Sequence, residues 1–98
     1  MLTEEFVREA LKDVYDPELP YNIIDLGLVY NVEIRGGNVH VLMTLTSPGC
    51  PIGPFMAEQV QEVVKLLPGV EDAEVEITFD PPWDPSRMSE EAKESLGM

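Results

Sequence analysis

Two runs of alternating residues flank a pair of glycines, and this pattern constrains the fold more than any other feature of the sequence. Residues 28–35 and 39–45 place apolar side chains at every second position. Such alternation is typical of strands with one buried face. Gly36-Gly37, or Gly37-Asn38, can take the positive φ angles of a tight turn. The sequence therefore predicts a hairpin with Val29 facing outward and these residues inward: Leu28, Tyr30, Val32, Ile34, Val39, Val41, Met43 and Leu45.

Helical patterns lie on both sides of this hairpin. Thr3, followed by Glu4 and Glu5, is typical of a helix N-terminus. Apolar residues then recur at helical spacing, which predicts a first helix over about residues 4–14, ending before Asp16-Pro17. A second helix is expected to stop at Pro68-Gly69, with a buried stripe formed by Met56, Val60, Val63, Val64 and Leu67.

A third strand and a proline-rich tail complete the chain. The strand is predicted near residues 72–79, with Ala73, Val75, Ile77 and Phe79 facing inward. The tail should close with a short helix that starts at Asp84-Pro85 or at Ser89. The order α-β-β-α-β-(α) predicts one α+β domain over residues 1–98, a two-layer sandwich whose three-stranded mixed sheet carries the helices on one face.

The second face of this sheet is expected to be polar. It is predicted to be solvated, or covered by the tail or by a second copy of the chain, which would make a homodimer. His40 is expected to be a solvated residue there, about ten residues from the single cysteine and too far for a Cys-His dyad within one chain. The residues predicted for this face are Glu33, Arg35, His40, Thr44, Thr46, Glu74, Glu76 and Thr78.

The charge of the chain excludes two classes of partner. Nineteen acidic and six basic residues give a formal net charge of −13, which repels phosphate backbones and anionic lipid headgroups. No apolar run approaches the ~20 residues that a membrane span requires, and the N-terminus lacks the basic and apolar regions of a signal peptide. We therefore expect neither a nucleic-acid nor a membrane partner, and a cytoplasmic location. The single free thiol fits a reducing compartment.

That thiol, Cys50, lies in the stretch LTSPGCPIGP between the second strand and the second helix. Nearby helix N–H groups and the helix dipole can lower the pKa of a thiol, and a thiolate is both a nucleophile and a ligand for soft metals. Free cysteine is also among the most buried residue types, so Cys50 as a small packing residue is the structural alternative. The pattern alone leaves both interpretations open.

Carboxylates in the connection YDPELPYNIIDLG are the next candidates. Its 13 residues are long for so compact a chain, and long ordered loops are often functional. Asp16 and Glu18 are expected either to form a turn or to meet the cysteine loop, whereas Asp25 is expected to form a turn. Trp83 in FDPPWDP is predicted to be an anchor for the tail. Iron–sulfur clusters normally take four ligands, so in a chain with one cysteine any cluster is expected to be bridged between protomers, completed by carboxylates or external thiols, or held in passing with a client.

Three stretches, DPELPYNIIDLGLVY, LTSPGCP and FDPPWDPSRMS, together resemble the SufT/PaaD-like family of iron–sulfur cluster assembly proteins. The resemblance covers nearly the whole chain and implies an α/β fold and a role in maturing metal–sulfur proteins. The family site carries over as Asp16, Glu18, Thr46, Ser47 and Cys50. It also implies that Asp25 and Gly27 shape the loop.

We favour an assembly factor that is not an enzyme. In this hypothesis Cys50 is a transient ligand of iron or an iron–sulfur cluster, which is not tightly bound and is passed to an apo-metalloprotein client, with other assembly proteins as partners. The first alternative is a thiol-dependent enzyme with Cys50 as nucleophile and Glu18 or Asp16 as base. The second is a docking adaptor in which Cys50 only packs.

Overall fold

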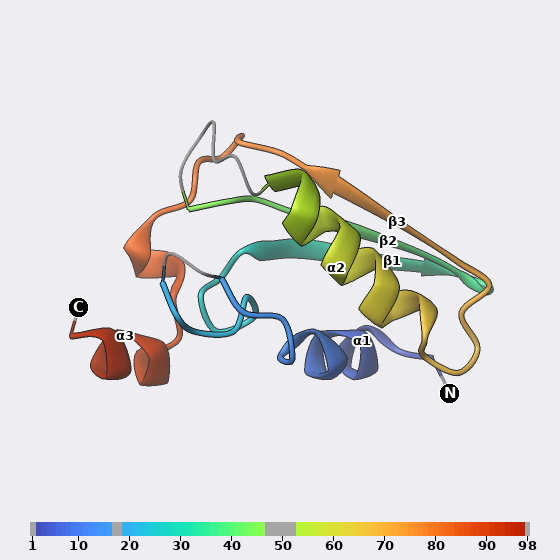
Figure 1. Ribbon diagram of the computed structural model, residues 1–98, viewed down its shortest axis with the longest axis horizontal. Coiled ribbons are helices and arrows are strands. Elements are labelled where there is room, and N and C mark those ends of the chain that lie inside the picture. The colour runs from blue at the N-terminus through green and yellow to red at the C-terminus, as the bar shows by residue number, and fades with distance from the viewer. Residues whose placement is uncertain (1, 17–18, 47–52, 98) are drawn as a thin grey trace.

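The computed structural model in Figure 1 describes residues 2–16, 19–46 and 53–97. The element order confirms the predicted α-β-β-α-β-(α) arrangement, with one 3-10 turn added in the tail. The elements are α1 (Glu4–Leu11), β1 (Val29–Arg35), β2 (Asn38–Met43), α2 (Gly53–Lys65), β3 (Asp72–Ile77), η1 (Pro85–Arg87) and α3 (Glu90–Leu96). None of the helices in these ranges is long and apolar enough to cross a membrane.

The sheet is mixed, as predicted. Its strand order is β1-β2-β3, with β1 antiparallel to β2 and β2 parallel to β3. The hairpin turns at Gly36, whose φ of 61° explains why a glycine stands there. Helix α2 connects the two parallel strands, and α1 and α2 lie on the same side of the sheet (Figure 1). The helices therefore bury one face of the sheet.

The core lies between these two layers. The inward residues predicted for β2 are confirmed, because Val39, Val41 and Met43 are buried. The stripe predicted for α2 is buried at Met56, Val60 and Val64, whereas Val63 and Leu67 are half-buried. Thr3 caps α1 as predicted, since its Oγ1 accepts a hydrogen bond of 3.1 Å from the amide of Phe6. The described core consists of Val7, Leu11, Val14, Ile23, Leu26, Leu28, Val29, Val32, Val39, Val41, Met43, Leu45, Met56, Val60, Val64, Ala73, Met88 and Ala92.

A β-bulge changes the predicted faces of β1. Val29 pairs with Met43 and Asn31 pairs with Leu42, so one extra residue, Tyr30, lies between two consecutive pairs. The prediction that Val29 faces outward is wrong, because the bulge places it in the core, and Tyr30 is only half-buried. The Tyr30 hydroxyl instead donates a hydrogen bond of 2.8 Å to the carbonyl of Pro81 in the tail.

Three predicted elements are shorter in the structure. Helix α1 ends at Leu11, so Val14 lies beyond it. The Val14 carbonyl instead accepts a hydrogen bond of 2.9 Å from the amide of Ile23. Strand β3 ends at Ile77, and Phe79 is 40% exposed rather than inward. Beyond Ile77 the amide of Thr78 still donates to the carbonyl of Met43 at 2.9 Å, and the hydroxyl of Thr78 bonds the backbone of Asp80. Helix α2 also ends at Lys65, before the predicted stop at Pro68-Gly69.

The second face of the sheet is open at one end and covered at the other. Glu74 and Glu76 are exposed, as a solvated face requires. Thr44, which was predicted for the same face, is fully buried by the chain itself. Exposure of Glu74 and Glu76 agrees with a solvated face, and Thr44 departs from it.

Candidate functional site

The connection between α1 and β1 is an ordered loop. The amide of Asp16 donates to the carbonyl of Tyr21 at 3.1 Å, and the amide of Leu28 donates to the carbonyl of Ile23 at 3.0 Å. Tyr15 and Asn22 form an antiparallel bridge across the loop. These bonds satisfy the backbone of a long segment without regular structure, so the prediction of a long ordered loop is confirmed.

Asp16 is a buried carboxylate in this loop. It is only 2% exposed, and its Oδ1 accepts a hydrogen bond of 3.3 Å from the amide of Leu19. A carboxylate that is removed from water must be held by hydrogen bonds, and the bond from the Leu19 amide is one of them. The bond from Leu19 agrees with the turn alternative for Asp16, and the alternative in which Asp16 meets the cysteine loop stays a prediction because that loop lies outside the described residues.

Asp25 also has the predicted turn role. Its Oδ2 accepts a hydrogen bond of 2.7 Å from the side-chain amide of Asn22, and its own amide donates to the Asn22 Oδ1 at 2.9 Å. This reciprocal pair links two residues three positions apart. The Asp25 side chain thus shapes the loop, as the family resemblance implies.

The C-terminal tail clasps the residues that follow Asp25. The indole of Trp83 donates a hydrogen bond of 2.7 Å to the carbonyl of Leu26, and the amide of Ser89 donates one of 2.7 Å to the carbonyl of Asp25. Gly27 has a φ of 77°, and a Cβ on it would overlap the backbone carbonyl of Arg87. The predicted roles of Trp83 as a tail anchor and of Gly27 as a loop residue are both confirmed.

Two threonines follow the end of β2. Thr46 is half-buried and lies three residues beyond Met43, the last residue of the strand. Thr44 is fully buried, and its amide donates to the carbonyl of Leu28 at 2.8 Å. Its Oγ1 is the one buried side-chain polar atom without a hydrogen-bond partner in the described part of the chain. Sequence reasoning placed Thr44 on an open face, and no signal in the alternation indicated its burial.

Three of the predicted site residues, Glu18, Ser47 and Cys50, lie outside the described residues. Cys50 belongs to the six residues, 47–52, that join Thr46 to the first residue of α2. Within residues 2–16, 19–46 and 53–97, no group of three or more His, Cys, Asp or Glu side chains is arranged to hold a metal ion. The described residues therefore supply Asp16 and Thr46 to the candidate site, but no metal centre of their own.

His40 lies away from these residues, on the open sheet face. Its Nε2 is 3.2 Å from Oε1 of Glu76 on β3, and its side chain is 34% exposed. It pairs with Glu33 in the antiparallel register and with Glu74 in the parallel register. The histidine is thus a surface residue surrounded by carboxylates, as predicted.

Comparisons with known proteins agree with the motifs. A family model described as "Iron-sulfur cluster assembly protein" matches residues 4–77, from the first residue of α1 to the last of β3. The chain is 47% identical over 96 residues to the Fe-S protein maturation auxiliary factor of Porphyromonas gingivalis, covering 97% of this chain and 91% of that protein.

Two further matches extend this similarity. The chain is 46% identical over 86 residues to the Fe-S protein maturation auxiliary factor SufT of Staphylococcus aureus, covering 87% of this chain and 98% of that protein. A crystal structure of a domain of unknown function from Bacillus anthracis has a TM-score of 0.90 at 39% identity, covering 97% of this chain and 92% of that one. The predicted α+β fold is therefore confirmed.

Proposed function

Because the chain belongs to the iron–sulfur cluster assembly protein family, we propose that it holds iron or an iron–sulfur cluster in passing and delivers it to client metalloproteins, with Cys50 as its own ligand. The observation that carries the proposal is the family match over residues 4–77, which include Cys50. The names of the maturation factors from Porphyromonas gingivalis and Staphylococcus aureus support the same role.

Because the chain has one thiol, Cys50 can be only one of the ligands of an iron–sulfur cluster. An iron–sulfur cluster normally takes four protein ligands, mostly thiolates, and this chain has one cysteine. The remaining ligands would be carboxylates of this chain or would come from a second copy, from an assembly protein or from the client itself. A cluster held by so few bonds from one chain leaves readily, which suits delivery rather than storage.

The residues around the thiol have separate proposed roles. Asp16 and Glu18 would supply oxygen ligands to iron or accept a proton from the thiol, and the hydroxyls of Thr46 and Ser47 would donate hydrogen bonds to a thiolate or a bridging sulfide. The burial of Asp16 supports this, because a carboxylate fixed by its turn needs little reorganisation to act as a ligand.

Partners and location follow from the same proposal. Apo-metalloprotein clients and other assembly proteins would meet the cargo at Cys50, where a second copy would form a homodimer if it supplied the missing ligands. A free thiol and a labile cluster both require a reducing compartment, for which the cytoplasm is the proposed location.

A cluster-transfer assay tests the proposal. The protein is loaded anaerobically with iron and sulfide and mixed with an apo-ferredoxin, and the acceptor's circular dichroism is followed. We expect the wild type to deliver cluster and Cys50→Ser to fail, with Asp16→Asn slower than the wild type. Equal delivery by Cys50→Ser would support the docking adaptor. Turnover of a small substrate by the unloaded wild type, but not by Cys50→Ser, would support the thiol enzyme.

A further inference from the structure

A hollow of about 380 Å³ lies where α1, the loop before β1, and the tail meet. Two of its lining residues are arginines, although the whole chain has only six basic residues against nineteen acidic ones. None of the described residues that line it is acidic. The lining residues are Arg8, Ile24, Gly27, Val29, Tyr30 and Arg87.

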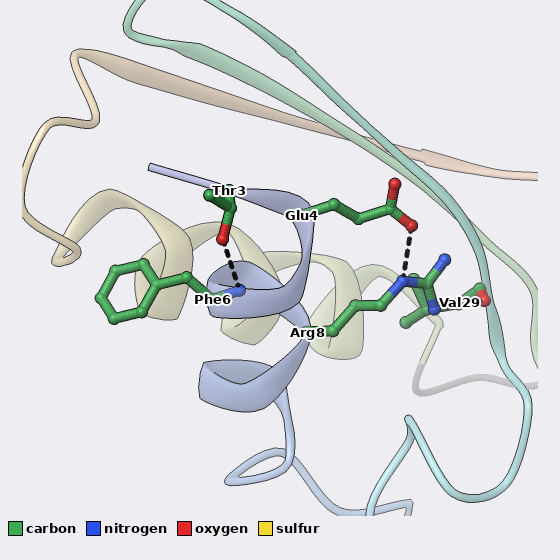
Figure 2. A network of polar contacts seen from close by, with 5 residues as sticks. All are labelled: Thr3, Glu4, Phe6, Arg8 and Val29. Carbon is green, nitrogen blue, oxygen red and sulfur yellow. Dashed lines mark hydrogen bonds and ion pairs between the residues drawn. The ribbon is translucent and has the colours of Figure 1, made fainter. Parts of the chain in front are cut away.

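Arg8 is held in place and still has donors to offer. Figure 2 shows its guanidinium beside Glu4 and the backbone of Val29. Its Nε donates to the Glu4 Oε2 at 2.9 Å, and its Nη1 makes a long contact of 3.5 Å with the Val29 carbonyl. These are its two hydrogen bonds within the described residues, and a guanidinium carries five N–H donors in all.

Arg87 reaches the same hollow from the tail. Its guanidinium carbon lies 4.7 Å from the centre of the Tyr30 ring, which fixes the planar group by stacking. Asp84 also attracts Arg87, but the Asp84 Oδ1 accepts a hydrogen bond of 2.8 Å from the amide of Ser86. Within the described residues Arg87 forms no ion pair. The described carboxylates therefore leave the Arg87 guanidinium outside any ion pair.

We propose that this hollow binds a carboxylate that is carried on an apolar stem. Guanidinium groups match the planar carboxylate with paired N–H donors, and Ile24, Val29 and the Tyr30 ring offer apolar surface for the stem. The net charge of −13 favours a monoanion over a phosphate dianion, because long-range repulsion grows with the charge of the ligand. The proposal uses only described residues and does not call on Cys50, so the two proposals can fail separately.

The probe for the test is benzoate, with neutral benzamide as its isostere. Amide shifts of Gly27 and Val29 are followed by NMR during titration of the full chain. We expect saturable binding of benzoate with a Kd on the order of 1–10 mM. Benzamide should bind about tenfold more weakly, because it lacks the charge that two arginines recognise.

Charge-neutralising variants assign the binding to this hollow. Arg87→Gln should raise the benzoate Kd about tenfold. Arg35→Gln removes the same charge on the open sheet face, where Arg35 pairs with Glu33, and should leave the Kd unchanged. Glu4→Gln should tighten benzoate binding, because it removes the carboxylate that pairs with the Nε of Arg8. This variant tests the site even if an Arg8 variant does not fold. Cys50→Ser should bind benzoate like the wild type, which separates this proposal from cluster delivery.

Four outcomes would overturn the proposal. These are equal binding of benzamide and benzoate, tighter binding of inorganic phosphate than of benzoate, equal losses in Arg87→Gln and Arg35→Gln, and no saturable shift at 50-fold excess over the expected Kd.

Discussion

The indole Nε1 of Trp83 donates a hydrogen bond of 2.7 Å to the carbonyl of Leu26, across 57 positions of the chain. This bond and the bond from Ser89 to Asp25 hold the tail on the loop that precedes β1. The matched family region ends at Ile77, so the tail adds its support from outside that region.

The Trp83 bond gives a direct stability prediction. Trp83→Phe keeps an aromatic ring but leaves the buried carbonyl of Leu26 without its donor. We expect the free energy of unfolding to fall by about 1–2 kcal/mol in urea titrations. Hydrogen exchange at Gly27 should also become faster. Unchanged stability together with unchanged exchange would show that the tail contact contributes nothing.

Gly27 provides a second prediction with a matched control. Gly27→Ala should lower the stability by about 3 kcal/mol or more, because it adds the strain of a positive φ to an overlap with the Arg87 carbonyl. Gly36→Ala has a similar φ, but no atom lies within 4 Å of the added Cβ. Its expected loss is about 1 kcal/mol. Equal losses in the two variants would contradict the close packing of the tail on Gly27.

Replacing Thr44 with valine should raise the free energy of unfolding. Its buried Oγ1 has no hydrogen-bond partner within the described residues, so Thr44→Val removes a polar atom that burial penalises. We expect a gain of about 1 kcal/mol in thermal or urea unfolding.

The control is Thr78→Val, which should instead be destabilising by about 0.5–1 kcal/mol because its hydroxyl bonds both backbone groups of Asp80. A Thr44→Val protein that is less stable than the wild type would show that the hydroxyl has a partner after all.

The stability of η1, which Asp84 caps, should depend on pH. The hydrogen bonds from the amide and hydroxyl of Ser86 hold the pKa of Asp84 below its ordinary value of 3.8, and Arg87 and Lys93 add to this effect, against a smaller opposing contribution from desolvation. A lowered pKa means that the folded turn favours the charged carboxylate. Its contribution to stability is therefore complete above the ordinary pKa and is lost as the pH falls through the folded pKa.

An NMR titration of the Asp84 carboxyl carbon measures this pKa directly. The expected midpoint is below 3.8, with loss of protection at the Ser86 amide over the same range. In Asp84→Asn the acid-dependent loss at Ser86 should disappear. A midpoint at or above 3.8 would contradict the capping role.

The local patterns predicted the elements well but not the contacts between them. Thr3, the alternation around Gly36 and the apolar stripe of α2 specify structure through neighbouring residues, so sequence alone identified them. The faces of β1 were predicted wrongly at Val29, because Val29 and Tyr30 are both apolar enough to face inward. The bulge that decides between them is accompanied by a contact of Tyr30 with the distant tail.

The candidate site shows the same division. The turn role of Asp25 was predicted, and a turn was one of two alternatives for Asp16, since both side chains can bond residues three positions away. Sequence reasoning missed the burial of Thr44 and the presence of Arg8 and Arg87 in one hollow. Both depend on how separate segments pack together. The placement of Cys50 relative to Asp16 lies outside the described residues and stays a prediction.

The central claim is that Cys50 is a ligand for iron–sulfur cargo. Anaerobic reconstitution of the full chain with iron and sulfide, followed by desalting, visible absorption and iron analysis, tests it most directly. We predict a coloured wild type whose absorption and bound iron are lost in Cys50→Ser and kept in Arg35→Gln. A wild type that stays colourless and iron-free, or a Cys50→Ser protein that binds as much iron as the wild type, would contradict the account.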